Sequence, residues 1–144
     1  MLIENILKDK GGGVFTVDAE TSLAEAARLL DDKRIGAAVA VNGDGSLAGV
    51  LSERDIVRRV ARHGAAALDM KVGEAMTRDV ITISPKESMQ DGLERMTDRR
   101  IRHLPVVEDG QLRGLVSIGD LVKWRIADAE AEAEMLKSYM AGAS

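Results

Sequence analysis

Two copies of one sequence pattern make up most of this chain. Residues 49–57, GVLSERDIV, return as residues 114–122, GLVSIGDLV, at a constant offset of 65 residues. Shorter matches extend the likeness: residues 15–17 with 81–83, 22–25 with 88–91, 34–35 with 100–101, and 44–47 with 109–112. Repetition over this length indicates two copies of one supersecondary unit, neither of which can bury its apolar face alone. Functional residues are therefore to be sought where the copies meet.

Composition narrows the classes of protein to consider. With 144 residues, the chain is expected to form one compact unit. It has no cysteine, which excludes disulfides and thiolate metal sites, and its two histidines lack the residue pattern of a metal site. No apolar run approaches the length of a membrane span, and residues 1–10 do not resemble a secretory signal. We therefore expect a cytoplasmic protein with no membrane partner.

The first copy predicts the order strand, helix, strand, strand, helix. Ser22 and Glu25 form a capping-box pattern that opens a helix. The continuous apolar run from Ala37 to Val41 indicates a buried strand, and the Asn-Gly-Asp-Gly sequence after it indicates a hairpin turn. The expected elements are a strand at 14–17, a helix from Ser22, strands at 37–41 and 47–51, and a helix at 54–62 that stops at Gly64.

The second copy repeats this order. We expect a strand at 79–83, a helix after Pro85, and paired strands at 103–107 and 112–116 that turn at Asp109-Gly110. Pro105 lies inside one of these strands and cannot donate to a ladder, which indicates an edge or a bulge.

Three segments lie outside the repeated units. Residues 1–13 end in three glycines, which indicate a flexible joint, and the connection contains one or two helical turns at 71–76. The final helix is expected to continue from Leu121 towards Met140, past the end of the repeat, as an oligomer contact. The chain therefore divides into an N-terminal segment (1–13), a first repeat (14–64), a linker (65–78), a second repeat (79–126) and a C-terminal helical extension (127–144).

The repeated pattern Gly-h-h-Ser-x-x-Asp, in which h is apolar, is the candidate binding element. It places Ser52 and Asp55, and again Ser117 and Asp120, between the end of a strand and the first turn of a helix. Unpaired N–H groups and a partial positive charge at that place suit a phosphate, which the serine can also contact. The aspartate one turn later can accept hydrogen bonds from two neighbouring hydroxyls, as on a ribose, and the glycine lets the backbone approach closely.

A purely structural role accounts for the same spacing. Ser-x-x-Asp is also a capping box, which is needed simply to start a helix. The chain has two further boxes, at Ser22–Glu25 and at Ser88–Asp91, for which no ligand is proposed. The full strand and glycine context, present in both copies, is what favours binding.

These motifs resemble a tandem pair of CBS domains, the module named after cystathionine β-synthase. The resemblance spans roughly residues 14–125 and is carried by segments 49–55, 114–120, 75–77 with 80–83, and 102–107. It implies an α/β fold in which two pseudo-symmetric β-α-β-β-α repeats pack through their sheets and leave two clefts. Such clefts commonly bind adenosine compounds. AMP, ADP or ATP is expected, NAD(H) or S-adenosylmethionine is possible, and no obligatory cofactor is implied.

The resemblance also implies roles for individual residues. Asp55 and Asp120 would hold the ribose, and Ser52 and Ser117 the phosphate. Strand residues would line the adenine, and their backbone groups would recognise its edge: Thr16 and Val17 in one cleft, Thr82 and Ile83 in the other.

Differences between the copies predict unequal clefts. Arg54 in the first copy is replaced by Gly119 in the second, and Ala37 by His103. A guanidinium beside a phosphate adds charge and can bind it in two places, so the first cleft is predicted to prefer more phosphates. Arg102 and His103, at the start of a strand, complete the set of candidate ligand contacts.

The sequence as a whole favours a regulatory adenosine-nucleotide-binding module, without catalysis, that forms a homodimer and acts on a separate, unidentified protein. No nucleophile–base pair or metal cluster supports an enzyme. The ligand would favour one arrangement of the repeats, which the partner senses. One alternative is a protein-interaction or structural module with vestigial clefts. The other is a nucleic-acid-binding protein, which is disfavoured by the net charge of −4 and by the single Trp, Tyr and Phe.

Overall fold

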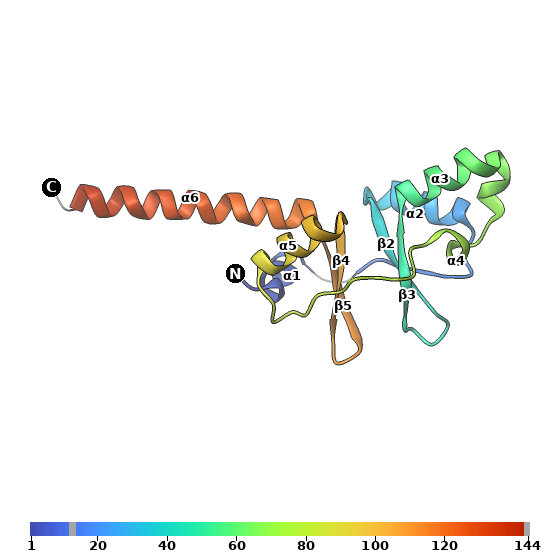
Figure 1. The fold of residues 1–144 in the computed structure, drawn as a ribbon, viewed down its shortest axis with the longest axis horizontal. Coiled ribbons are helices and arrows are strands. Elements are labelled where there is room, and N and C mark those ends of the chain that lie inside the picture. The colour runs from blue at the N-terminus through green and yellow to red at the C-terminus, as the bar shows by residue number, and fades with distance from the viewer. Residues whose placement is uncertain (12–13, 143–144) are drawn as a thin grey trace.

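The computed structural model describes residues 1–11 and 14–142 and shows two repeats side by side, with one long helix projecting from the second (Figure 1). Gly12 and Gly13 of the predicted joint lie outside the described residues. The first repeat contains β1 (Thr16–Asp18), α2 (Leu23–Lys33), β2 (Ala37–Val41), β3 (Leu47–Ser52) and α3 (Glu53–His63). The second contains α5 (Met89–Arg99), β4 (His103–Glu108), β5 (Gln111–Ser117) and α6 (Ile118–Gly142). The remaining elements are α1 (Ile3–Lys10), the 3₁₀ helix η1 (Gly64–Asp69) and α4 (Val72–Ala75).

The first repeat confirms the predicted order of strands and helices. β1 pairs parallel to β2, and β2 pairs antiparallel to β3. Ser22 caps α2 by accepting a hydrogen bond from the N–H of Glu25, and Gly64 ends α3 with a φ of 63°. The inner faces of these elements form a hydrophobic core in which Leu23 and Leu51 are fully buried.

The strand predicted at 79–83 does not form. Ile83 alone pairs, through one parallel bridge to Val106. The next rung of the ladder would need an N–H at Pro105 to donate to the carbonyl of Ile81, and proline has none. At the equivalent place in the first repeat, the N–H of Val39 donates to the carbonyl of Phe15, and β1 forms there. The carbonyl of Thr82 accepts a hydrogen bond from the guanidinium of Arg95 at 3.0 Å. The sheet of the second repeat therefore has two strands, β4 and β5.

Both hairpins carry a β-bulge at the corresponding place. The register shifts between Ala40 and Val41 in the first hairpin and between Val106 and Val107 in the second. The second bulge follows Pro105, where the sequence suggests one. Because the first hairpin bulges without a proline, the bulge belongs to the repeated hairpin geometry and not to the proline.

The chain segment that precedes each repeat packs on the opposite repeat. We call these two segments, residues 2–10 and 71–79, the crossing segments. In the first, Ile3 and Ile6 of α1 are fully buried in the core of the second repeat. In the second, Val72 of α4 is fully buried in the core of the first repeat. Matching backbone bridges hold the two segments and join Leu2 to Ser88 and Lys71 to Ser22. The sequence pattern did not predict α1, because a helix of two turns has too little apolar periodicity to stand out.

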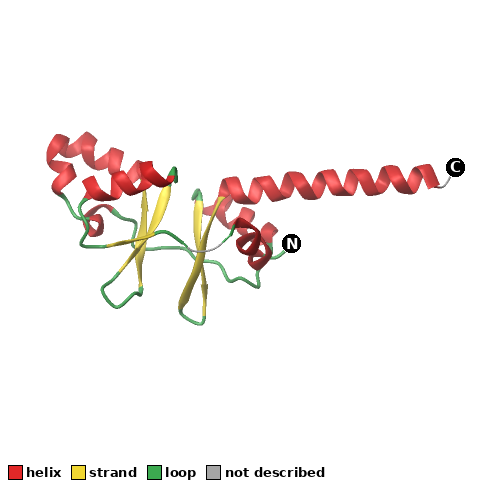
Figure 2. Ribbon diagram, turned by 180° about the vertical axis from the view of Figure 1, so that it is seen from behind, coloured by secondary structure: helices red, strands yellow, loops and turns green. Residues whose placement is uncertain are grey.

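The hairpins lie next to each other at the centre of the molecule, and helices flank them on the outside (Figures 1 and 2). α2 and α3 lie beside the hairpin of the first repeat, and α1 and α5 beside that of the second. α6 runs away from both repeats, as the predicted C-terminal helical extension requires (Figure 2). The α/β fold of two similar repeats is thereby confirmed.

Gly49 and Gly114, the first residues of the repeated motif, make room for the crossing segments. A Cβ on Gly49 would lie 2.4 Å from the carbonyl oxygen of Thr77, and one on Gly114 would lie 2.7 Å from Cδ2 of Leu7. Next to Gly49, the backbones of Val50 and Thr77 form two hydrogen bonds of 3.0 and 2.9 Å. The sequence assigned these glycines to the approach of a ligand, whereas the close approach at Gly49 is made by the chain itself.

The substitution Gly49→Ala is expected to destabilise the fold, because the added methyl group would push the Thr77 backbone out of its hydrogen bonds with Val50. Overpacking of this kind costs about 1–3 kcal/mol, which lowers the melting temperature of a domain of this size by about 2–10 °C. Thermal denaturation followed by circular dichroism measures the change. Gly43→Ala is the control, since its added Cβ would meet no atom within 4 Å. Equal melting temperatures for the two variants would contradict this account.

Candidate functional site

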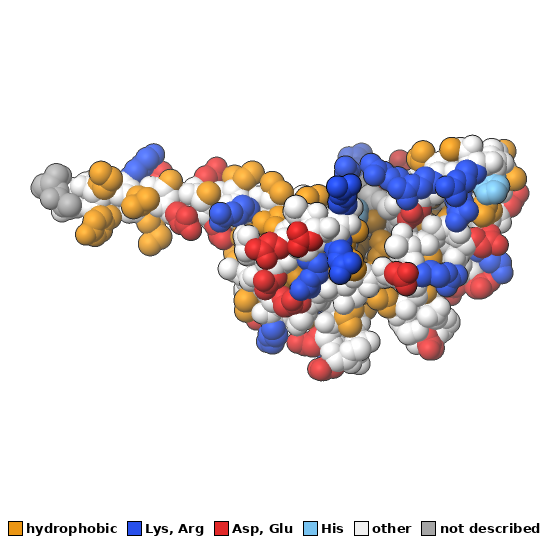
Figure 3. All heavy atoms as spheres, viewed as in Figure 1, with side chains coloured by type: hydrophobic (Ala, Val, Ile, Leu, Met, Phe, Trp, Pro, Cys, Tyr) orange, Lys and Arg blue, Asp and Glu red, His pale blue; other side chains and the backbone are white. Residues whose placement is uncertain are grey.

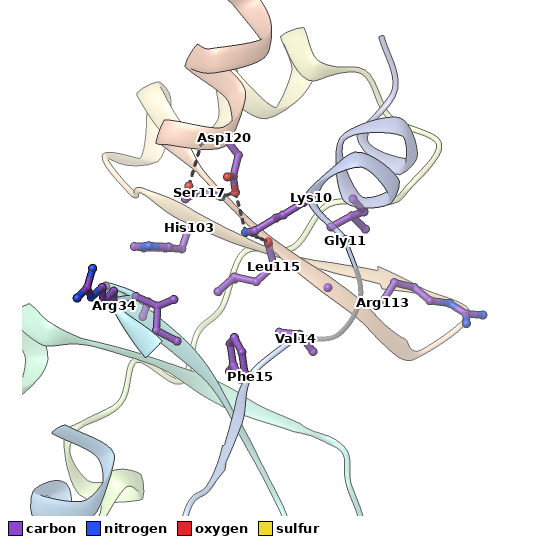
Figure 4. Close-up of a pocket in the computed structure, with 15 residues that line it drawn as sticks. Lys10, Gly11, Val14, Phe15, Arg34, His103, Arg113, Leu115, Ser117 and Asp120 are labelled. Atoms are coloured by element: carbon purple, nitrogen blue, oxygen red, sulfur yellow. Dashed lines mark hydrogen bonds and ion pairs between the residues drawn. The ribbon is translucent and has the colours of Figure 1, made fainter. Parts of the chain in front are cut away.

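Two cavities open between the repeats, and both repeats line each of them. The cavity that contains Ser52 and Asp55 has a volume of about 570 Å³, and we call it the Asp55 cleft. The cavity that contains Ser117 and Asp120 has a volume of about 600 Å³, and we call it the Asp120 cleft (Figure 4). Each cleft adds residues from the start of the opposite repeat: Val80 and Ile81 in the Asp55 cleft, Val14 and Phe15 in the Asp120 cleft.

Both serine–aspartate pairs form capping boxes. The N–H of Ser52 donates to Oδ2 of Asp55 at 2.9 Å, and the N–H of Asp55 donates to Oγ of Ser52 at 3.2 Å. Ser117 and Asp120 form the same two bonds at 2.9 and 3.1 Å. The capping role is therefore confirmed. It does not exclude a ligand, because the cap uses Oδ2, and Oδ1 of each carboxylate can accept other hydrogen bonds; Oδ1 of Asp55 lies 3.8 Å from a guanidinium nitrogen of Arg58.

A third capping box lies away from the two clefts and shows the same cap without a cavity. Ser88 and Asp91 form the same pair of bonds, at 3.1 and 3.0 Å, at the start of α5. Neither residue is among the described residues that line the two cavities. Identical local geometry thus occurs with and without a cleft, so it is tertiary placement that distinguishes Asp55 and Asp120 from Asp91.

The structure brings an unpredicted residue, Lys10, into the Asp120 cleft. Its Nζ donates to Oδ2 of Asp120 at 2.8 Å and to the carbonyl of Leu115 at 2.9 Å (Figure 4). Burial acts to raise the pKa of Asp120, but the hydrogen bonds from Lys10 and from the backbone of Ser117 outweigh it and hold that pKa below its ordinary value. The carboxylate of Asp120 is therefore ionised and already paired.

The corresponding position in the other cleft carries the opposite charge. Lys10 follows the bridging residue Leu2 by eight positions, and Asp79 follows the bridging residue Lys71 by eight. Lys10 lines the Asp120 cleft, and Asp79 lines the Asp55 cleft. The two crossing segments thus place side chains of opposite charge in the two clefts. Neither residue belongs to a repeated sequence motif, so no sequence signal identified it.

The four residues predicted to line the adenine do not line either cavity. Val17 and Ile83 are buried in the hydrophobic cores of the first and second repeats. Thr16 and Thr82 are likewise not among the described residues that line either cavity. The cavity walls are formed two positions earlier in each copy, because Val17 and Ile83 turn inward to pack where the chain pairs with β2 or β4.

Two further arginines reach the clefts from strained backbone. Arg34 ends α2 with a φ of 54° and Arg100 ends α5 with a φ of 55°, both in the left-handed region that disfavours side chains. Arg34 lines the Asp120 cleft and Arg100 lines the Asp55 cleft. The repeated Arg-Ile pair was the sequence signal for both. Both residues close their helices as left-handed C-caps, and their backbone N–H groups donate to carbonyls of the last turn.

His103 lines both clefts and lies where they come closest along β4. Burial, followed by the positive charge of Lys10, lowers the pKa of His103 from its ordinary value, although Asp120 opposes this. The imidazole is therefore neutral at pH 7. Arg54 lines the Asp55 cleft, as predicted, and Arg102 lines the same cleft and not the Asp120 cleft.

The two clefts differ in their balance of charge. The Asp55 cleft is lined by four arginines and three carboxylates: Arg54, Arg58, Arg100 and Arg102, with Glu53, Asp55 and Asp79. The Asp120 cleft is lined by three cations and one carboxylate: Lys10, Arg34 and Arg113, with Asp120. Figure 3 shows basic side chains gathered in a row over α3 and the neighbouring edge of the second repeat. Both clefts are net positive, which suits an anionic ligand.

The described residues form neither a metal site nor a membrane-spanning helix. Within residues 1–11 and 14–142, no group of three or more His, Asp or Glu side chains is arranged to hold a metal ion. Across these residues, no helix is both long and apolar enough to cross a membrane. The two clefts are the candidate sites that the described residues offer.

Known proteins are similar to this chain over both repeats. The family model of the CBS domain matches residues 12–62 and 72–127. A solved CBS-domain-containing protein from Agrobacterium tumefaciens is 42% identical, with a TM-score of 0.83 over 86% of this chain and 92% of the other. The mitochondrial CBS domain-containing protein CBSX3 of Arabidopsis thaliana is 32% identical over 148 residues, which cover 97% of this chain and 72% of the plant protein.

One of the similar structures contains ligands. The CBS domain pair of protein MJ0100, solved in complex with 5′-methylthioadenosine and S-adenosyl-L-methionine, is 26% identical, with a TM-score of 0.79 over 89% of this chain and 98% of the other. CBS domains are generally regulatory and non-catalytic modules, and no catalytic family is indicated for this chain. Because the family model matches both repeats and the structure places two clefts between them, this chain belongs to the CBS-domain family, as a tandem pair of CBS domains.

Proposed function

We propose that the clefts bind adenosine-containing ligands and that the pair regulates a separate protein according to their occupancy. The observation that carries this proposal is the repeated serine–aspartate box at the wall of a cavity, on both sides of the molecule. The adenosine ligands of the protein MJ0100 pair support it. A volume near 600 Å³ lies within the range typical of small-molecule sites.

The roles of the site residues follow from their placement. Oδ1 of Asp55 or Asp120 would accept hydrogen bonds from the ribose hydroxyls, and the first turn of α3 or α6 would face the phosphate. The adenine would lie against the apolar wall of the opposite repeat, which is Val80 and Ile81 in one cleft and Val14 and Phe15 in the other. Val17 and Ile83, which are buried in the two cores, would then support this wall from behind, whereas Thr16 is exposed and Thr82 is half-buried.

Ligand binding in the Asp120 cleft involves Lys10. A ribose that approaches Asp120 meets a carboxylate already bonded to the Lys10 ammonium. A ligand with a phosphate or carboxylate nearby offers Lys10 a second acceptor, whereas a neutral nucleoside does not. The Asp120 cleft is therefore inferred to favour anionic ligands. Lys10 belongs to α1, so occupancy of this cleft would be communicated to the core of the second repeat.

We infer in addition that the protein forms a homodimer. The observation is α6, whose exposed apolar side chains have no cover within the described chain. A dimer would present the clefts of two copies to one partner, whose identity is open.

Adenosine ligands are expected to raise the melting temperature. A ligand at 100 times its dissociation constant stabilises by about 2.7 kcal/mol, which corresponds to about 5–10 °C here. The double variant Asp55→Ala with Asp120→Ala should lose this shift, because both proposed ribose acceptors are gone. Differential scanning fluorimetry with AMP, ATP and S-adenosylmethionine measures the shift.

Asp91→Ala is the matched control, since it removes the same kind of capping box away from the clefts and should keep the full shift. If the double variant also keeps it, these aspartates do not hold the ribose; if no adenosine compound binds at millimolar concentration, vestigial clefts are favoured instead.

The Asp55 cleft is expected to prefer ATP over AMP because of Arg54. One charge-assisted hydrogen bond contributes about 1.5–3 kcal/mol, or roughly ten- to a hundred-fold in affinity. Calorimetry on the Asp120→Ala background should show this preference, and adding Arg54→Gly, which copies the residue at Gly119, should remove it. Arg62→Gly serves as the control, because Arg62 is exposed on the same helix and does not line the cleft. An ATP-to-AMP ratio unchanged by Arg54→Gly would rule out the phosphate role.

Affinity for AMP is expected to depend on pH through His103. Because the pKa of His103 is lowered in the free protein, the imidazole gains its charge only at a pH below its ordinary value of 6.5. A bound anion favours the charged form, so lowering the pH from 7.5 to 6 should improve AMP binding by the wild type relative to His103→Gln. Comparison of the two proteins at each pH cancels the protonation of the phosphate itself. His63→Gln, at the exposed end of α3, should behave as the wild type. Identical pH profiles for the wild type and His103→Gln would show that no anion lies beside His103.

A further inference from the structure

The last part of α6 projects beyond both repeats. Residues 129–142 are all exposed, and the helix extends away from both repeats (Figure 1). A single helix of this length is only marginally stable in water, because most helical stability in proteins comes from a packed apolar face. A helix that projects into solvent therefore needs a surface to cover its apolar side.

Six apolar residues of α6 form one continuous stripe, which we call the outer stripe; Met135 and Tyr139 are also apolar and exposed but lie off it. Its members recur at alternating intervals of four and three: Val122, Ile126, Ala129, Ala133, Leu136 and Met140. The four large side chains are 42%, 55%, 62% and 70% exposed, in that order. This interval pattern is the heptad repeat of a coiled coil, maintained over the whole projecting helix.

The outer stripe is separate from the face by which α6 packs on its own repeat. Leu121 is fully buried in the core of the second repeat, and Trp124 packs against the same core. At about 100° of rotation per residue, the stripe is centred roughly a quarter turn from Leu121. A second helix can lie along it without displacing the contacts of the first turn.

We propose that the outer stripe pairs with the outer stripe of a second copy of this chain, as a parallel, in-register, two-stranded coiled coil. The inference rests on the proposed self-association and adds the surface and the direction of pairing. Ile126 falls on core position a of the heptad, and Leu136 falls on core position d. A β-branched residue at a with leucine at d favours a coiled coil of two helices. Ala129 and Ala133 at the centre let the helices approach closely.

The charges that flank the stripe select the parallel direction. In a parallel pair, the residue just before core position a of one helix lies opposite the residue five places further along the other helix. Arg125 then faces Glu130 of the second copy, and Glu132 faces Lys137 of the second copy, so that both contacts are attractive. Lys137 also lies 3.8 Å from Glu134 on its own helix, but this exposed pair is weak and leaves the ammonium in reach of Glu132.

The antiparallel alternative places like charges together. With the stripes aligned over the same length, Glu130 would meet Glu130, Glu132 would meet Glu132, and Lys123 would meet Lys137. Like charges at such flanking positions destabilise pairing and exclude wrong partners. Charge complementarity therefore favours a second copy in the parallel direction.

The direction of pairing can be tested by cysteine crosslinking, because the chain has no cysteine of its own. Leu136→Cys places one thiol on the stripe, and in a parallel pair it meets the same residue of the second copy. Mild oxidation should therefore give a covalent dimer in high yield. Met135→Cys is the matched control, since Met135 is 73% exposed but lies off the stripe, and it should crosslink poorly. Crosslinking of Leu136→Cys only when mixed with Ile126→Cys would show an antiparallel pair and overturn the proposal.

The strength of pairing is measured by sedimentation equilibrium of the intact protein. Leu136→Ser should weaken the dimer at least tenfold, whereas Met135→Ser should change it less than twofold. Glu132→Lys and Lys137→Glu should each weaken it several-fold, and the combined charge exchange should restore it, because only the parallel pair joins these two positions. A monomer at tens of micromolar would overturn both the self-association and the coiled coil. A dimer that Leu136→Ser leaves intact would overturn the coiled coil alone, and neither result bears on ligand binding.

Discussion

Each repeat of this protein depends on a segment that precedes the other repeat. Val72 and Met76 complete the core of the first, and Ile3 and Ile6 complete the core of the second. A sheet of two or three short strands is marginal by itself, so neither repeat has a sufficient core without the borrowed residues. The two repeats therefore fold as one unit, held at Gly49, where the absence of a side chain lets the Thr77 backbone pair with Val50.

The clefts follow from this crossing. Each crossing segment passes the start of α3 or α6 before the next repeat begins. The opening residues of each repeat therefore face the serine–aspartate pair of the other repeat. Capping these helices and lining the cavity are two consequences of the same placement. Asp91 has the cap without the cavity, which separates the two roles within one molecule.

Pseudo-symmetry places equivalent positions in both clefts but does not make them chemically alike. Lys10 and Asp79, from the two crossing segments, line the two clefts with opposite charge, and Lys10 pairs with Asp120 whereas Asp55 faces Arg58. His103 lies between the clefts and has Ala37 as its counterpart, so one side chain serves both sites. Two clefts that differ in this way can respond to different ligands or to different concentrations of one ligand, which suits a regulatory module.

The sequence alone determined the repeated unit, most of its strands and helices, and the serine–aspartate boxes, because these depend on local patterns of apolar spacing, caps and turns. It also predicted the helix that continues past the second repeat. Only the tertiary structure decided which residues line the clefts. The strand at 79–83 was lost because the pairing register sets the carbonyl of Ile81 against Pro105, which has no N–H to donate, and Val17 and Ile83 are buried in the cores instead of lining the cavities. Lys10 reached Asp120 across 110 residues of sequence, and no local pattern contains a contact of that range, because it exists only once α1 is buried against the second repeat.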